Sequence, residues 1–244
     1  MERAEKSPTQ NHRHPTFRKL KFLQYTRYFF YVAWHWNLPL AVFVIYHEWR
    51  GEKKYGMHTI GYDTLKSLED NGVDISHATM YMPANFYGLD KIFDELKALQ
   101  GCEGHFLDLG CGKGRTLIVA AHYGFRKVTG VDFSKSFCDE AKALIGQMKD
   151  QYPETQFQVK HQDAFYYDIP ADVNVIYLFN PFDGVIMSGV VANIARSQRK
   201  HPRTIYILYI NPQEEKLFTA EGYKREFHYT KLKFLEGVIL KKEG

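Results

Sequence analysis

The sequence has few cysteines, and none is arranged for a metal knuckle or a disulfide framework. Only three of the 244 residues are cysteine, and Cys102, Cys111 and Cys138 show no Cys-x-x-Cys spacing. An odd number of scattered cysteines indicates reduced thiols and a cytoplasmic protein. The histidines also lack the spacing of metal ligands. We therefore expect no metal site.

The greater part of the sequence lacks an excess of charge of either sign. Residues 1–27 contain seven Lys or Arg and two Glu, a net charge of +5, whereas the remainder contains 25 basic and 26 acidic residues, a net charge of −1. A nearly neutral domain lacks the basic surface of nucleic-acid-binding proteins. We expect no nucleic-acid partner, and we interpret residues 1–16 as a mobile basic arm.

One stretch lacks formal charge, but it is a poor membrane span. Residues 28–46, YFFYVAWHWNLPLAVFVIY, are just long enough to cross a bilayer. His35, Asn37 and Pro39 lie at the middle, where polar groups cost most. The stretch predicts two helices broken near Asn37. We expect residues 17–80 to form an aromatic-rich helical extension that covers a catalytic domain, with peripheral membrane contact through residues 17–50 as the alternative.

Apolar segments with strand and helix patterns alternate from about residue 86. Short runs such as HFLDLG and NVIYLFN are typical of buried strands, and segments such as KGRTLIVAAHYG have helical spacing. This alternation predicts a doubly wound, mostly parallel α/β sheet with right-handed crossovers. The runs YKREFHYT and KFLEGVILKK follow each other closely, which predicts an antiparallel C-terminal hairpin at one edge.

The segment DLGCGKGR joins the first strand to the first helix of this pattern. Gly110, Gly112 and Gly114 predict a tight turn that a nucleoside ligand can approach closely. A dinucleotide-binding turn would have its third glycine where Arg115 stands. Asp108 would repel a pyrophosphate, but it would pair with the α-ammonium group of an amino acid. S-adenosylmethionine contains both an amino acid and a nucleoside.

Two further acids follow the next two strands. Asp132 ends the second strand, where a carboxylate can accept hydrogen bonds from both ribose hydroxyls, and Phe133 follows it. Asp163 follows the third strand and could accept a hydrogen bond from the adenine amine, with Ala164 packed on the ring. Each Asp taken alone is better explained as a turn or helix-cap residue. Three acids at the ends of three successive strands favour a common ligand.

Over roughly residues 80–241 the sequence resembles the class I, seven-stranded S-adenosylmethionine-dependent methyltransferases. DLGCGKG is similar to their first motif, GVD to their ribose-binding acid, QDAF to their adenine edge and LFNPF to their fourth motif. The pair DLGCGKGR and YLFNPF most resembles a bacterial group of such proteins with unassigned substrates. The resemblance implies a seven-stranded fold with residues 81–244 as the methyltransferase domain, S-adenosylmethionine as the cofactor, and methyl transfer as the activity.

The resemblance also implies which residues place the methyl acceptor. Asn180 would present its side-chain carbonyl to an amine, Pro181 would fix the turn, and Phe182 would pack against the methyl group or the amine. Tyr81 is expected at the methionine end of the cofactor. The family's amino-group motif has two prolines, whereas FNPF has one. The expected acceptor is a protein amine, ranked before a small-molecule or lipid-associated acceptor.

Two other classes of function stay open at this point. An NAD-dependent oxidoreductase would share the glycine turn and Asp132, but it gives no reason for Asp108, for FNPF or for the hairpin. A non-catalytic scaffold that binds S-adenosylmethionine is the second alternative, with the N-terminal extension as its functional part. In each case we expect a cytoplasmic protein, with peripheral attachment to a membrane as a variant of that location.

Overall fold

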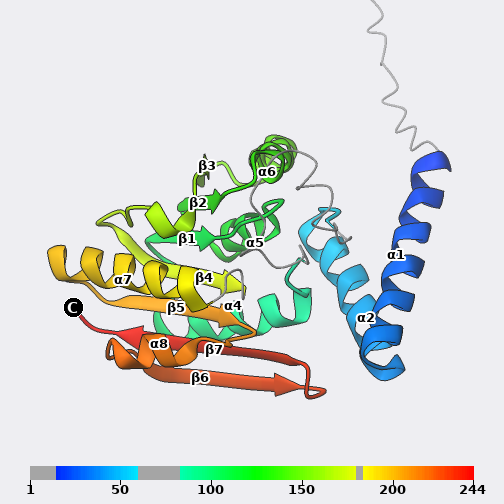
Figure 1. Cartoon of the computed structure of the whole chain (residues 1–244). Coiled ribbons are helices and arrows are strands. Elements are labelled where there is room, and N and C mark those ends of the chain that lie inside the picture. Colours follow the sequence, from blue (N-terminus) through cyan, green and yellow to red (C-terminus); the bar gives the residue numbers. More distant parts are fainter. Residues whose placement is uncertain (1–14, 60–82, 180–183) are drawn as a thin grey trace, which may run out of the picture.

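The computed structural model describes residues 15–59, 83–179 and 184–244. Its centre is one seven-stranded sheet with helices on both faces, and a pair of helices stands at one end of the sheet (Figure 1). This arrangement confirms the predicted α/β class with an N-terminal helical extension.

The sheet has the strand order β3-β2-β1-β4-β5-β7-β6. The first five strands in the sequence run parallel, and β7 runs antiparallel to both β5 and β6. The predicted parallel sheet and edge hairpin are therefore confirmed. The strands are β1 (His105–Leu109), β2 (Lys127–Asp132), β3 (Gln156–His161), β4 (Val173–Phe179), β5 (Ile205–Ile210), β6 (Lys224–Lys231) and β7 (Leu235–Lys242).

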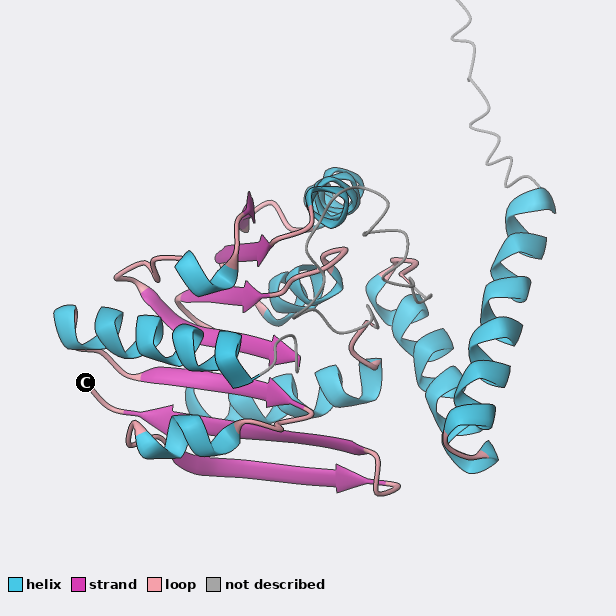
Figure 2. Ribbon diagram, in the orientation of Figure 1, coloured by secondary structure: helices cyan, strands magenta, loops and turns pink. Residues whose placement is uncertain are grey.

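Helices cover both faces of the sheet (Figure 2). One buried cluster joins α4, α5 and the end of α6 to one face, and a second joins α7 and α8 to the other. The described helices are α1 (Pro15–His35), α2 (Leu38–Tyr55), α4 (Phe86–Gln100), α5 (Arg115–Tyr123), α6 (Lys135–Met148), α7 (Gly184–Lys200) and α8 (Glu215–Ala220), with the 3-10 turns η1 (Lys149–Gln151) and η2 (Ala164–Tyr166).

The strand order places a crevice next to the helix pair. Strands β1 and β4 are neighbours, and the connections from them lead to opposite sides of the sheet. Sheets of this kind bind ligands at the carboxyl ends of the strands on either side of such a switch point. In this protein the parallel strands end on the side that carries α1 and α2, and the turn between β6 and β7 lies at the same end (Figure 1).

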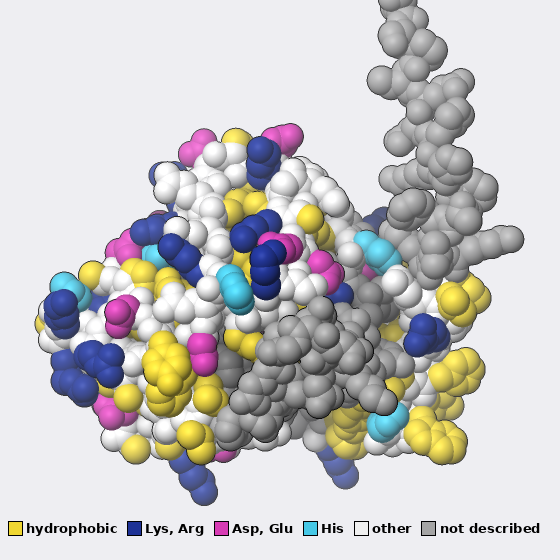
Figure 3. All heavy atoms as spheres, turned by 45° about the horizontal axis from the view of Figure 1, so that its top comes forward, with side chains coloured by type: hydrophobic (Ala, Val, Ile, Leu, Met, Phe, Trp, Pro, Cys, Tyr) yellow, Lys and Arg dark blue, Asp and Glu magenta, His cyan; other side chains and the backbone are white. Residues whose placement is uncertain are grey.

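Helices α1 and α2 form a hairpin that is broken where the sequence predicts. Asn37 caps α2 by accepting a hydrogen bond from the backbone N–H of Leu40 (2.8 Å), and Pro39 fits the first turn because its nitrogen needs no partner there. The helices share a small core of their own, around Tyr28 and Val44. In the ranges that the structure describes, no helix is long and apolar enough to cross a membrane. Hydrophobic side chains nevertheless gather on the outside of the hairpin, at the right of Figure 3.

The helix pair is anchored to the sheet domain through α2. Gly51 lies so close to the ring of Phe86 that a Cβ atom there would overlap it. The Tyr55 hydroxyl and the Lys54 ammonium group both donate to Asp90 on α4. Packing and hydrogen bonds therefore hold α2 against the helix layer of the sheet domain.

Candidate functional site

The glycine turn after β1 adopts a backbone that other residues avoid. Gly110, Gly112 and Gly114 have φ angles of 87°, 49° and 83°, in the left-handed region that costs residues with a Cβ atom energy. The backbone N–H groups of Gly110 and Cys111 donate to the carbonyl of Val131 at 2.8 and 3.0 Å. The turn is thereby fixed across the end of β2.

Asp132 holds this turn from the end of β2. Its carboxylate accepts hydrogen bonds from the backbone N–H groups of Gly112 (2.8 Å) and Ser134 (2.9 Å). Burial raises the pKa of Asp132 to about 6, although these two hydrogen bonds act in the opposite direction. Each oxygen has a further acceptor position, so the arrangement leaves room for the predicted ribose contact. These two hydrogen bonds give Asp132 the turn role that the sequence offered for it as a single residue.

Asp108 is a buried carboxylate that lacks a full set of partners. Its side chain is 2% exposed, and its Oδ1 atom has no hydrogen-bond partner among the described residues. Burial, followed by the nearby charge of Asp132, raises the pKa of Asp108 well above its usual value, while a hydrogen bond from Thr116 opposes the shift. A buried unpaired carboxylate is costly. A cationic group of a ligand would relieve that cost, which fits the α-ammonium group of S-adenosylmethionine.

Two tyrosines that were not predicted from the sequence add buried hydroxyl groups to the polar region around Asp108. Tyr177 on β4 is the register partner of Asp108 across the switch point. Burial, then the charges of Asp108 and Tyr229, raise the pKa of Tyr177 well above its usual value. The hydroxyl oxygen of Tyr229 on β6 is buried without a partner among the described residues. The only signal for Tyr177 was a hydroxyl-bearing residue inside the apolar run NVIYLF; Tyr229 gave none.

The predicted adenine edge follows β3 beside the end of β2. The backbone N–H of Gln162 donates to the carbonyl of Asp132 (3.0 Å). Asp163 itself is exposed and caps η2 by accepting from the backbone N–H of Phe165 (2.8 Å). Ala164 is buried and Phe133 is half-buried. The structure therefore gives Asp163 a local capping role, and contacts of these residues with adenine stay a prediction.

Arg115, the residue that follows the glycine turn, connects distant segments. Its guanidinium group forms an ion pair with Glu48 on α2 (2.8 Å). It also donates to the hydroxyl of Thr59 and to the carbonyl of Ala84, both at 2.7 Å. Thr59 precedes and Ala84 follows residues 60–82, so a single side chain joins two described segments that are far apart in the sequence.

Four of the predicted site residues lie outside the described part of the chain. Tyr81 falls in residues 60–82, and Asn180, Pro181 and Phe182 fall in residues 180–183. Their predicted roles remain predictions.

A cavity of about 450 Å³ lies at the carboxyl ends of β4 and β5. It is bounded by the helix pair, by the start of α4 and by the β6–β7 hairpin, and it includes the residues next to both undescribed stretches, Pro83 and Phe179. Its size suits one small molecule or one extended side chain. The apolar lining residues are Val32, Trp36, Leu40, Val44, Pro83, Phe179, Ile210, Phe234 and Leu235; those with polar groups are Tyr28, Asn85, Asn211, Gln213, Tyr229, Lys233 and Glu236.

No cluster of three or more His, Cys, Asp or Glu that could hold a metal ion occurs within the described ranges. The three cysteines are free and buried.

Comparison with known proteins relates the sequence and the fold to methyltransferases. Residues 107–207 match the family model described as "Methyltransferase domain". The fold is similar to that of a magnesium protoporphyrin IX methyltransferase from Synechocystis PCC 6803, crystallised with bound S-adenosylmethionine, at 16% identity over 64% of this chain and 77% of that chain, with a TM-score of 0.50. It is also similar to the PH0226 protein from Pyrococcus horikoshii OT3, at 13% identity over 75% of this chain and 100% of that chain, with a TM-score of 0.51. None of the curated proteins matches the sequence.

The sheet is that of the Rossmann-like methyltransferase fold, and residues 107–207 match the methyltransferase family model. The predicted cofactor, S-adenosylmethionine, agrees with this match and with the ligand bound in the Synechocystis protein. The match does not support the NAD-dependent alternative.

Proposed function

We propose that the protein transfers the methyl group of S-adenosylmethionine to an amine. The observation that carries this proposal is the buried carboxylate of Asp108, with an unpaired oxygen, at the switch point of the sheet. Asp108 would hold the α-ammonium group, the glycine turn would accommodate the close approach of the ligand, and Asp132 would accept from the ribose hydroxyls.

The donor supplies a methyl group that its sulfonium already activates. The chain has to hold the acceptor in line with that group and to exclude water. Asn180 and Pro181 would orient the amine, because they directly follow Phe179, which ends β4 and lines the cavity. An acceptor that enters the cavity would therefore approach the end of β4.

The shape of the cavity bears on the kind of acceptor. It has room for one extended side chain, which supports a protein amine as the first candidate. Its largely apolar lining supports a second candidate, a small-molecule or lipid-associated acceptor. Gln213 is exposed and lines the cavity. A bulky residue there should narrow the cavity without disturbing the core, so Gln213→Trp should slow methyl transfer with unchanged cofactor affinity, whereas Gln213→Ser should change neither.

The test of the activity is transfer of a labelled methyl group into a cell extract. The full-length protein is incubated with labelled S-adenosylmethionine and an extract, and the label is then measured in the protein, lipid and small-molecule fractions. Label that depends on the enzyme and is lost with Asp108→Asn supports the proposal, and the fraction identifies the acceptor class. Tight cofactor binding without label in any fraction would favour the non-catalytic scaffold.

A further inference from the structure

The α1–α2 hairpin exposes large apolar side chains on its outer surface. On α1 they include Leu23, Phe30 and Trp34, and on α2 they include Leu38, Val42 and Trp49. The spacing of four or seven residues places each set on one face of its helix, opposite the face that packs around Tyr28 and Val44. Trp34 is 88% exposed and Phe30 is 68% exposed. Contiguous exposed apolar side chains of this size mark an interaction surface.

The charged residues of the hairpin are distributed in a one-sided way. Arg27, Arg50 and Lys53 are exposed. The two acids between residues 22 and 55 are turned inward: Glu48 pairs with Arg115, and Glu52 accepts hydrogen bonds from Tyr25 and contacts His58. The outer surface of the described helix pair therefore combines aromatic and aliphatic groups with charged groups that are all cations. Residues 1–27, which lead into it, carry a net charge of +5.

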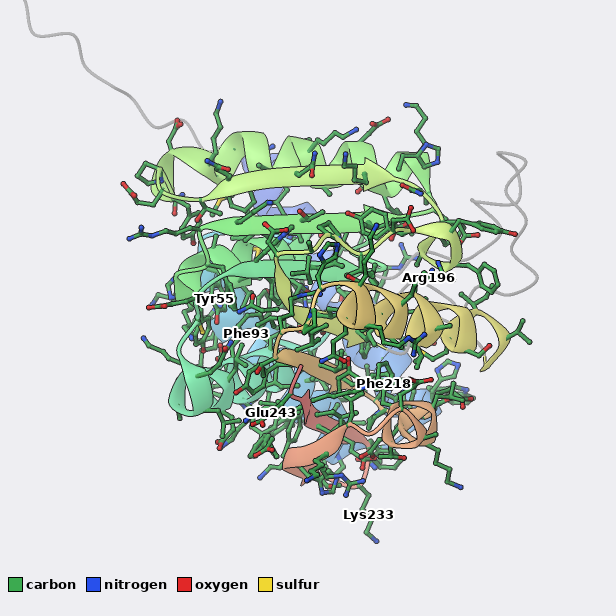
Figure 4. All side chains as sticks on the ribbon, turned by 90° about the vertical axis from the view of Figure 1, so that its left-hand side faces the viewer. Tyr55, Phe93, Arg196, Phe218, Lys233 and Glu243 are labelled. Carbon is green, nitrogen blue, oxygen red and sulfur yellow. The ribbon has the colours of Figure 1, made fainter. Side chains whose placement is uncertain are left out.

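The turn between β6 and β7 lies beside the helix pair, on the side of Tyr28 and Val44. Leu232 and Phe234 are exposed there and alternate with Lys231 and Lys233. The ammonium group of Lys231 lies 5.6 Å from the ring centre of Phe43 on α2, so the turn is next to the helix pair. Lys233 points away from the body of the protein (Figure 4). The acid nearest to this turn in the β6–β7 hairpin is Glu236, whose Oε1 atom lies 2.8 Å from Nε2 of His228.

We propose that this surface, formed by the outer faces of α1 and α2, docks on an anionic lipid membrane without crossing it. The described parts of α1 and α2 combine aromatic side chains with Lys and Arg and have no exposed acid, which suits the interfacial region and its negative surface potential. A second copy of the chain suits the surface less well, because a two-fold dimer would bring the same cations against each other. This proposal goes beyond methyl transfer and does not depend on it.

Flotation of the full-length protein with lipid vesicles tests the proposal. The protein should float with vesicles of phosphatidylcholine mixed with phosphatidylglycerol, and much less with pure phosphatidylcholine. Raising the salt concentration from about 0.05 to 0.5 M should weaken binding, because it screens the cations. Phe30→Ser with Trp34→Ser should weaken binding by at least about tenfold, since both rings lose their burial in the interface. The control, Leu99→Ser on α4, removes an exposed apolar residue elsewhere and should bind as the wild type does.

A second variant, Arg50→Glu with Lys53→Glu, keeps the aromatic residues and reverses the charge, so it should lose the preference for anionic vesicles. Unchanged thermal unfolding of each variant shows that the effect comes from the surface. The proposal is overturned by three outcomes: no flotation of the wild type, flotation of both variants at wild-type level, or a dimer in light scattering that Phe30→Ser with Trp34→Ser dissociates.

Discussion

Glu48 on α2 and Arg115 at the start of α5 form an ion pair of 2.8 Å with side chains that are 1% and 3% exposed. Arg115 follows the glycine turn directly, whereas Glu48 belongs to the N-terminal extension, 67 residues earlier. The contact crosses the boundary that we predict at residue 81. The extension is thus coupled to the segment that shapes the cofactor site, and the pair makes this coupling testable.

Replacing Glu48 should destabilise the whole protein. Glu48→Gln leaves the Arg115 charge buried without its partner, which we expect to lower the free energy of unfolding by about 3–5 kcal/mol. Denaturant unfolding measures this change. As the matched control, Asp139→Asn removes one partner of an exposed pair with Lys135 and should have no measurable effect. Equal stability of both variants would show that the buried pair does not hold the extension in place.

Asp108→Asn should weaken cofactor binding and at the same time stabilise the free protein. Loss of a charge-assisted hydrogen bond should cost about 1.5–3 kcal/mol of affinity for S-adenosylmethionine. Without ligand, Asn lacks the negative charge that burial penalises. At pH values above 7 the melting temperature of the variant should therefore be higher than that of the wild type. Calorimetry and thermal unfolding measure the two effects. The control is Asp172→Asn, near His105 at the amino end of the sheet, which should leave the affinity unchanged. Tighter cofactor binding or a lower melting temperature in Asp108→Asn would contradict the assignment.

Cofactor binding should release a proton from the protein. The pKa of Asp108 is raised in the free protein because of burial and the charge of Asp132. A bound ammonium group favours the ionised carboxylate, so the affinity should increase with pH until Asp108 is ionised without ligand. Asp132, with a pKa of about 6, contributes mainly below neutral pH. Calorimetry at pH 7.5 in two buffers of different ionisation enthalpy counts the released protons. Release that persists in Asp108→Asn would assign the proton to another group.

Asn180→Ala should separate methyl transfer from cofactor binding. Asp108 and Asp132 hold the charged and hydroxyl groups of the cofactor in our assignment, so the affinity should stay nearly normal. Single-turnover transfer should fall by roughly two to three orders of magnitude, the usual scale for one polar group aimed at the reacting centre. Both quantities are measured on one preparation with an accepting extract. A parallel loss of both would place Asn180 in the cofactor pocket, and no loss would reject the amine-orienting role.

Local features of the sequence were sufficient for the fold and for part of the site. Periods of two and of about 3.6 residues identified the strands and helices, because each element has to bury one face. The glycines of DLGCGKGR identified a turn with positive φ angles, since that backbone is a property of the turn itself. The position of Asp108 and Asp132 at strand ends followed from the same local pattern.

Contacts between distant segments were decided only in the tertiary structure. No local pattern relates Glu48 to Arg115, or Asp108 to Tyr177, because these pairs depend on how α2 packs and on which strands become neighbours. The cavity likewise exists only because α1, α2 and the β6–β7 hairpin meet at the ends of β4 and β5. Sequence periodicity determined which faces of the elements are buried, whereas the partner of each face depended on the packing of the whole chain.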